Sequence, residues 1–173
     1  MNDIYKGLIQ IYTGDGKGKT TAALGQAIRA AGHNMKIVFI QFMKGIPTGE
    51  HHFMSNHPAF EIIQISKGNS FSKSQEQLGR EAQDTLSYAE LEIHSGKYEM
   101  VVLDEILTAV NQNLITTKQV LDLMDHKPKT LEIILTGRNA PPEIIQRADL
   151  VTEMLMIKHP YTEGIEGRRG IEF

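Results

Sequence analysis

The stretch Thr13-Gly14-Asp15-Gly16-Lys17-Gly18-Lys19-Thr20-Thr21 decides the fold of this 173-residue chain. It lies between an apolar run at 8–12, which predicts a strand, and a segment at 20–31 whose small residues recur at helical spacing. Gly18-Lys19-Thr20 matches the end of a Walker A motif, although Thr13 stands where that motif has its first glycine. Gly14 and Gly16 must then supply the loop's conformational freedom. Such a loop predicts a phosphate site, and the alternative is a glycine-rich turn that only leads into a helix.

Individual residues of this loop are expected to contact a nucleotide. Lys19 would neutralise the terminal phosphates, and the hydroxyl of Thr20 would reach Mg²⁺. Lys17 is either a second phosphate ligand or a solvated loop charge. The helix that follows directs the positive end of its dipole at the same anion. The predicted nucleotide-binding residues are Gly14, Asp15, Gly16, Lys17, Gly18, Lys19, Thr20 and Thr21.

The rest of the sequence alternates between apolar β-branched runs and amphipathic stretches. Further strands are predicted at 36–42, 60–65, 100–103, 131–136 and 150–157, and further helices at 74–94, 117–124 and 141–148. Nearly continuous apolar strands are typical of a parallel sheet that is buried on both faces. We therefore expect one α/β domain at 1–173, with three layers, a mostly parallel sheet and a fold of the phosphate-loop NTPase type. The segments 43–58 and 158–173 are expected to be irregular, and loops of this length tend to be functional or disordered.

Two acidic residues, Asp104 and Glu105, follow directly on the predicted strand at 100–103. Ligands of open α/β folds collect outside the carboxyl ends of the strands. An acidic pair there can hold Mg²⁺ or its waters opposite the phosphate loop, together with Thr20. The alternative is an acidic start to the next helix, which the helix dipole favours.

The composition excludes several classes of function. The chain has no Cys and therefore no disulfide, thiolate metal site or thiol nucleophile. A formal net charge of −3 and a pI near 6.2 argue against nucleic acid as the main partner. The sequence has neither an apolar run of membrane-spanning length nor an N-terminal signal peptide. We expect a soluble, cytoplasmic protein without a membrane partner.

Several motifs in the same order resemble the ATP:corrinoid adenosyltransferases of the phosphate-loop type, over nearly the whole chain. In that family Thr also stands at the position of Thr13, and Asn is usual at the position of Asp15. The matching segments lie at 14–23, 38–45, 80–82, 101–105, 136–138, 148–154, 158–159, 164–165 and 170–173.

The resemblance implies transfer of the 5′-deoxyadenosyl group of ATP to cobalt(I) of a reduced corrinoid, with release of triphosphate. The cobalt is the nucleophile, so a chain without Cys is compatible with the reaction. By resemblance, Lys19 and Glu105 are the candidate catalytic residues, and Thr20, Asp104 and Glu105 would surround Mg²⁺ or Mn²⁺. Further substrate-binding candidates are Phe71, Arg80 and Arg138. The implied partners are ATP, cob(I)alamin or a related corrinoid, a reductant such as a flavoprotein, and a second copy of the chain.

Some residues keep two interpretations. Family members often have Phe-Thr-Trp beside the corrin, whereas this chain has Ser70-Phe71-Ser72 and no Trp. Phe71 either replaces one aromatic residue of that segment or anchors the following helix in the core. Arg138 either reaches phosphate or ribose, or forms a surface ion pair.

Other features allow rival readings of the chain. The three histidines at 51, 52 and 57 are expected to lie in a solvated loop rather than to bind metal. The first strand begins within ten residues of Met1, so the loop at 43–58, a partner subunit or a second protein would have to enclose the corrin. The alternative function is that of a small phosphotransferase or ATPase. Phosphotransferases usually need an Arg-rich lid, and the arginines of this chain are few and scattered.

Overall fold

A computed structural model describes residues 6–173, apart from the side chain of Phe71. Over these residues six parallel strands form one sheet in the order β3-β2-β4-β5-β1-β6. The strands are β1 (Ile9–Thr13), β2 (Ile37–Gln41), β3 (Phe60–Gln64), β4 (Met100–Asp104), β5 (Glu132–Thr136) and β6 (Leu150–Glu153). The helices are α1 (Lys19–Ala31), α2 (Gly49–Met54), α3 (Gln75–His94), α4 (Ile106–Asn111), α5 (Thr117–His126) and α6 (Pro142–Arg147). Two 3-10 helices lie at Ser70–Ser72 and Pro160–Glu163.

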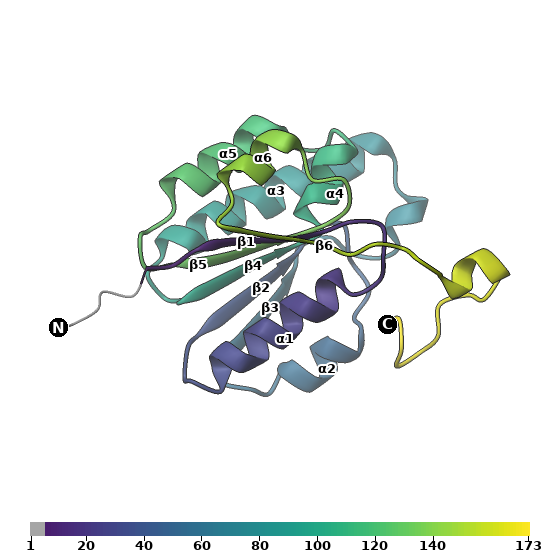
Figure 1. Cartoon of the computed structure of the whole chain (residues 1–173), viewed down its shortest axis with the longest axis horizontal. Coiled ribbons are helices and arrows are strands. Elements are labelled where there is room, and N and C mark those ends of the chain that lie inside the picture. The colour runs from purple at the N-terminus through teal and green to yellow at the C-terminus, as the bar shows by residue number, and fades with distance from the viewer. Residues whose placement is uncertain (1–5) are drawn as a thin grey trace.

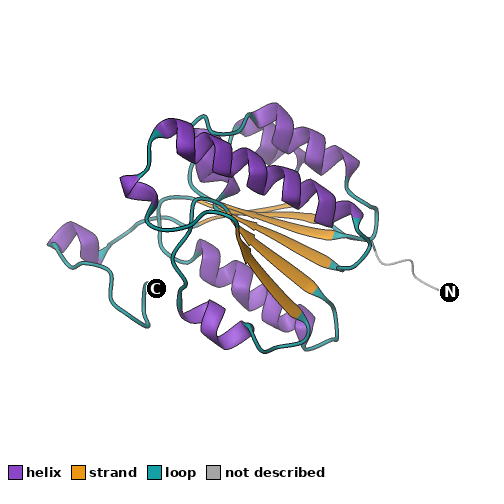
Figure 2. Cartoon of the chain, turned by 180° about the vertical axis from the view of Figure 1, so that it is seen from behind, coloured by secondary structure: helices purple, strands orange, loops and turns teal. Residues whose placement is uncertain are grey.

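Helices cover both faces of the sheet, which confirms the three-layer α/β prediction. Helices α1 and α2 lie on one face and α3 to α6 on the other (Figure 1), and the view from behind shows the same two layers (Figure 2). Side chains of β2 alternate between them: Ile37 and Phe39 pack with the alanines of α1, whereas Val38 and Ile40 pack toward the other layer. All four are fully buried. Each such side chain contributes about 1.5–3 kcal/mol, so both helical layers are held by strong apolar contacts.

The order of the strands creates a crevice at their carboxyl ends. The chain leaves β1, follows α1 and re-enters the sheet at β2, while β5 and β4 fill the space between these two strands. The register pairs Tyr12 with Thr136 and Gln41 with Asp104. The ends of four neighbouring strands therefore meet beside the loop that follows β1, at the position where open parallel sheets bind ligands.

The predicted strands and helices are confirmed with shifts of a residue or two, except in three places. The last strand was predicted to run to 157 but ends at Glu153, opposite Thr13, where its partner β1 also ends; Met154 O then accepts from Gly16 N–H of the loop after β1 at 2.7 Å. The segment 43–58 contains α2, since Thr48 and His51 form a capping box that starts a helix there. Helix α4 follows Glu105 directly and was not predicted.

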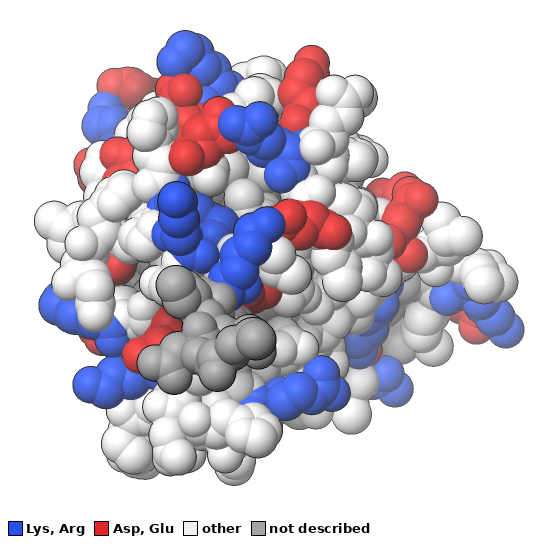
Figure 3. Space-filling view, turned by 60° about the vertical axis from the view of Figure 1, so that its left-hand side comes forward, with Lys and Arg blue, Asp and Glu red and all other residues white. Residues whose placement is uncertain are grey.

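The surface mixes both signs of charge. On the face shown in Figure 3, Lys and Arg side chains gather near the centre, with Asp and Glu side chains beside them. Within residues 6–173, none of the helices is both long and apolar enough to cross a membrane.

Candidate active site

The loop between β1 and α1 is shaped by close packing against the segment after β6. Gly14 and Gly18 have φ angles of 97° and 123°, which disfavour other residues. A Cβ atom at Gly14 would lie 2.4 Å from Met154 O, and one at Gly16 would lie 2.7 Å from Leu155 O. The N–H of Gly16 donates to Met154 O at 2.7 Å. These glycines therefore let the loop backbone approach the segment after β6 closely, and they also permit the loop's conformation. The N–H of Gly16 already donates to a protein carbonyl.

Lys19 is the first residue of α1 and lies where the helix dipole is positive. Its side chain is buried, and its Nζ donates to Gly16 O at 2.8 Å. Burial lowers the pKa of the Lys19 ammonium below its usual value, and the carboxylate of Glu105 opposes that shift. Among the described residues, no side chain caps the N-terminus of α1. The loop thus presents a buried cation beside the uncapped end of a thirteen-residue helix, which suits a phosphate group.

The carboxylate of Asp104, at the end of β4, joins four segments of the chain. Its Oδ1 accepts hydrogen bonds from Thr20 Oγ1 at 2.9 Å and Thr136 Oγ1 at 2.7 Å. Its Oδ2 accepts from Gln41 Nε2 at 3.1 Å and from Lys44 Nζ at 2.7 Å. Asp104 has no exposed surface, so its charge is tolerable only because these donors and the Lys44 cation compensate it.

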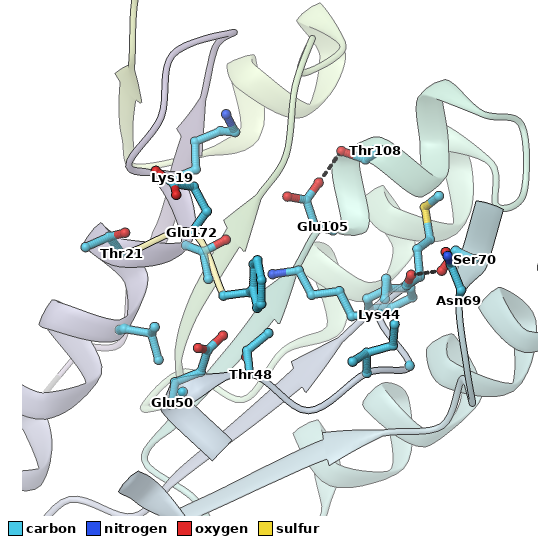
Figure 4. A pocket seen from close by; sticks show the side chains of 18 of the residues that line it. Lys19, Thr21, Lys44, Thr48, Glu50, Asn69, Ser70, Glu105, Thr108 and Glu172 are labelled. Carbon is cyan, nitrogen blue, oxygen red and sulfur yellow. Dashed lines mark hydrogen bonds between the residues drawn. The ribbon is translucent and has the colours of Figure 1, made fainter. Parts of the chain in front are cut away.

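Glu105 adopts a left-handed backbone conformation, with φ 63° and ψ 15°, directly before α4. This conformation costs about 1–2 kcal/mol in a residue other than glycine. Two bonds hold the residue there: its N–H donates to Thr136 Oγ1 at 2.9 Å, and its Oε2 accepts from the hydroxyl of Thr108. Its side chain lines the cavity described next (Figure 4). The residue also directly precedes helix α4, which agrees with the alternative prediction of an acidic start to the next helix.

A cavity of about 980 Å³ collects these groups. Its walls come from segments that follow β1, β2, β3 and β4, together with the C-terminal segment 170–173 (Figure 4). One part is polar and charged, and includes Lys19, Thr20, Lys44 and Glu105. The apolar lining is contributed by Leu24, Phe42, Met43, Ile46, Leu78, Ile171 and Phe173. A cavity with both linings can hold a phosphorylated group beside a large apolar one.

The structure brings about half of the predicted site residues together at the cavity; Gly14, Asp15 and Gly16 belong to the same loop but do not line it. Gly18, Lys19, Thr20, Thr21 and Glu105 line the cavity, and Asp104 lies directly behind them.

Other predicted residues lie at the rim or outside. Lys17 lines the cavity, but its Nζ binds Ile171 O at 3.1 Å and Glu172 Oε1 at 2.9 Å. Arg138 is exposed, and its guanidinium lies 4.0 Å from the carboxylate of Asp15.

One predicted substrate-binding residue, Arg80, does not line the cavity. Arg80 lies on the exposed side of α3 and forms an ion pair with Glu76. The side chain of Phe71 is outside the described part of the chain.

Four polar residues of the site were not predicted: Gln41, Lys44, Thr136 and Glu172. Gln41 and Thr136 end apolar strands and look like ordinary strand residues in the sequence. All four lie within segments that resemble the family, and for Lys44 and Glu172 a charged residue among apolar and glycine residues was a further signal. Gln41, Lys44 and Thr136 contact Asp104 across 63, 60 and 32 positions, and Glu172 contacts Lys17 across 155. Sequence patterns do not reveal contacts over such separations.

A phosphate loop after β1, an acidic strand end at β4 and an all-parallel sheet define the class of phosphate-loop NTPase-like proteins. A KaiC-like protein from Pyrococcus horikoshii shares this fold, with a TM-score of 0.62 and 16% identity over 89% of this chain and 75% of its own. At that identity the likeness concerns the fold alone.

Comparison of the amino-acid sequence with known families and relatives identifies the family. The model of the family described as ATP:corrinoid adenosyltransferase BtuR/CobO/CobP matches residues 5–173. A corrinoid adenosyltransferase of Sinorhizobium is 38% identical over 97% of this chain and 81% of its own length. The corrinoid adenosyltransferase CobA of Salmonella typhimurium is 33% identical over 97% of this chain and 86% of its own length. The chain belongs to the ATP:corrinoid adenosyltransferase family.

Proposed function

We propose that this chain transfers the 5′-deoxyadenosyl group of ATP to the cobalt of a reduced corrinoid within the cavity of about 980 Å³. Family membership supports the reaction. The observation that carries the assignment to this site is that Lys19, Glu105 and an apolar wall face one cavity. The rival reading as a phosphotransferase or ATPase is not favoured by the relatives, which are named corrinoid adenosyltransferases.

The chemistry makes limited demands on the protein. Cobalt(I) of the corrinoid supplies two electrons for a new bond to the ribose C5′ of ATP and becomes cobalt(III). The bond between C5′ and the triphosphate oxygen breaks, and triphosphate leaves with that electron pair. The protein must align C5′ with the cobalt and stabilise the charge that accumulates on the leaving group. No protein nucleophile takes part.

The charged wall of the cavity suits the leaving group. Lys19 would exchange its bond to Gly16 O for a phosphate oxygen, and the start of α1 adds its dipole. Gly18 and Thr21 line the same wall. Lys17 and Arg138 lie at the rim of the loop and can add positive charge, with Asp15 beside Arg138. The assignments of Arg80 and Phe71 to substrate stay predictions from the family resemblance.

The donors near Lys19 fit a divalent cation such as Mg²⁺ or Mn²⁺. No cluster of three or more His, Cys, Asp or Glu ligands occurs in the described part of the chain, but Mg²⁺ bound to a nucleotide needs only one or two carboxylates. Thr20 directs its hydroxyl proton at Asp104 and so keeps its lone pairs for a cation. Both oxygens of Asp104 already accept two hydrogen bonds each, which makes Glu105 the better direct ligand. The cation would neutralise charge on the triphosphate.

The remaining parts of the proposal follow from the family. The corrin would contact the apolar wall formed by residues such as Leu24, Ile46 and Leu78. A reductant such as a flavoprotein would supply the cobalt(I) state. We further propose a homodimer, a cytoplasmic location and one nucleotide-binding domain over 1–173.

One assay tests the proposal. The protein is incubated with ATP, Mg²⁺ and chemically reduced cobalamin, and the corrinoid spectrum and the phosphate product are measured. Adenosylcobalamin and triphosphate are expected in equal amounts, and Lys19→Ala should reduce both at least 100-fold. Lys118→Ala, on the exposed side of α5, is the control that should retain activity. Formation of ADP without corrinoid would instead identify a phosphotransferase or ATPase.

A further inference from the structure

The loop that follows β2 directs a second lysine into the cavity, opposite the phosphate loop. Lys44 comes from a different strand end than Lys19, and its Nζ lies 2.7 Å from Asp104 Oδ2. About 30% of its side chain stays exposed, whereas the carboxylate that it binds has no exposed surface. Figure 4 shows the Lys44 side chain extending into the cavity below Glu105. The Lys44 side chain is therefore partly open on its cavity side, where a ligand can approach it.

The backbone around Lys44 is built to hold this orientation. Met43 has a φ angle of 59°, an unfavourable left-handed conformation for a residue with a side chain, and its carbonyl accepts a hydrogen bond from Ser70. Gly45 O accepts from Gly68 N–H at 3.0 Å. A Cβ atom at Gly45 would lie 2.5 Å from Gly68 O, so only glycine fits this approach. Hydrogen bonds of Met43 and Gly45, on either side of Lys44, thus hold a strained turn that directs the Lys44 ammonium group into the cavity.

Compensation of the Asp104 charge explains the ion pair, but not why Lys44 approaches from the cavity. Thr20, Gln41 and Thr136 already donate to its two oxygens. A lysine held by a buried aspartate could lie anywhere around it, but this one reaches the aspartate from the cavity. Triphosphate carries about four negative charges, and Lys17 at the rim is partly neutralised by Glu172. Glu50 and Glu105 also line the cavity, and without Lys44 their charge would repel that anion.

We propose that Lys44 is a ligand of the triphosphate group, held in position by a bond to Asp104 that uses one of its three N–H donors. Its ammonium group then donates to a phosphate oxygen on the side of the cavity opposite Lys19. The inference rests on the proposed function for the identity of the leaving group. It adds a residue outside the phosphate loop to the groups that stabilise charge as the C5′–O bond breaks.

Binding of two separate probes tests this role without turnover. Tripolyphosphate and adenosine are titrated separately into the protein by calorimetry, with EDTA present. Lys44→Met should weaken tripolyphosphate binding about 10- to 100-fold, the value of one charge-assisted hydrogen bond. It should change adenosine affinity less than twofold, and Lys44→Arg should recover most of the loss. Lys73→Met is the matched control, since Lys73 lines the same cavity but binds both carboxylate oxygens of Glu81 at 2.7 Å.

Two results would overturn the inference: unchanged tripolyphosphate affinity in Lys44→Met, or equal weakening of both probes. Because Lys44→Met leaves the Asp104 charge uncompensated, the same comparison is made on a neutral background. Asp104→Asn combined with Lys44→Met should bind tripolyphosphate at least 10-fold more weakly than Asp104→Asn alone, and equal affinities would refute a phosphate contact. If the wild-type chain bound tripolyphosphate through Lys44 but formed no adenosylcobalamin, the proposed function would fail and this inference would stand.

Discussion

Replacing Thr136 by Val tests whether one buried hydroxyl holds the two acidic residues of the site. Thr136 has no exposed surface and ends β5, between β1 and β4. Its hydroxyl donates to Asp104 Oδ1 at 2.7 Å and accepts from Glu105 N–H at 2.9 Å. Val has nearly the same shape and can make neither bond, so the change removes both with little effect on packing.

The magnitude follows from these two bonds. A hydrogen bond to a charged group is worth about 1.5–3 kcal/mol, and an unsatisfied buried N–H costs about 1–3 kcal/mol. Since the losses overlap at one site, we expect Thr136→Val to lower the free energy of unfolding by about 2–4 kcal/mol. For a chain of 173 residues, 3 kcal/mol corresponds to a fall in Tm of about 6–12 °C. Glu105 would also lose a restraint on its left-handed backbone, so transferase activity should fall about tenfold or more.

Urea unfolding and the adenosylcobalamin assay measure these two effects. Thr136→Ser is the control, because it keeps the hydroxyl and loses only a methyl group, which costs about 1 kcal/mol. The midpoint of Thr136→Val should lie clearly below that of Thr136→Ser, with an unchanged m-value. Equal stability and activity of the two variants would show that the hydroxyl does not organise the site.

Two further predictions concern the edges of the cavity. Gly45→Ala places a Cβ 2.5 Å from Gly68 O, so thermal melting should show a loss of about 1–3 kcal/mol and calorimetry a weaker affinity for ATP; wild-type behaviour would contradict the close approach. Hydrogen bonds from Arg168, then from Lys17, lower the pKa of Glu172 to about 2 from an ordinary 4.5, so this contact stabilises the tail above pH 4.5 and is lost as the pH falls toward 2. Carboxyl NMR titration should show that midpoint, and Arg168→Met should raise it more than Lys17→Met; no change in either variant would disprove the contact.

The sequence predicts those parts of the site that neighbouring residues encode. The phosphate loop is one continuous stretch between a strand and a helix, so its position and the fold class follow from local patterns. Asp104 and Glu105 are predicted for the same reason, as an acidic pair that ends an apolar strand. Thr136 and Lys44 are not, because their importance depends on which strands become neighbours.

The predictions that were wrong also depend on contacts between segments that are distant in the sequence. The apolar run at 154–157 resembles a continuing strand, but β6 ends where its partner β1 ends, and Met154 O binds Gly16 N–H of the phosphate loop instead. Leu155 and Ile157 in that run are 69% and 93% exposed, so apolar character alone does not indicate burial there. The contact of Lys17 with Glu172 spans 155 positions and has no periodic signal in the sequence.

The Asp104 carboxylate also has a consequence for how the chain folds. Its four partners are separated from it by 84, 63, 60 and 32 positions and come from the start of α1, the end of β2, the loop after β2 and the end of β5. An intermediate in which β5 has not yet docked between β1 and β4 lacks one of the four and cannot form the complete site. We therefore expect full ATP affinity to return during refolding only after β5 has docked, so its regain reports on these long-range contacts.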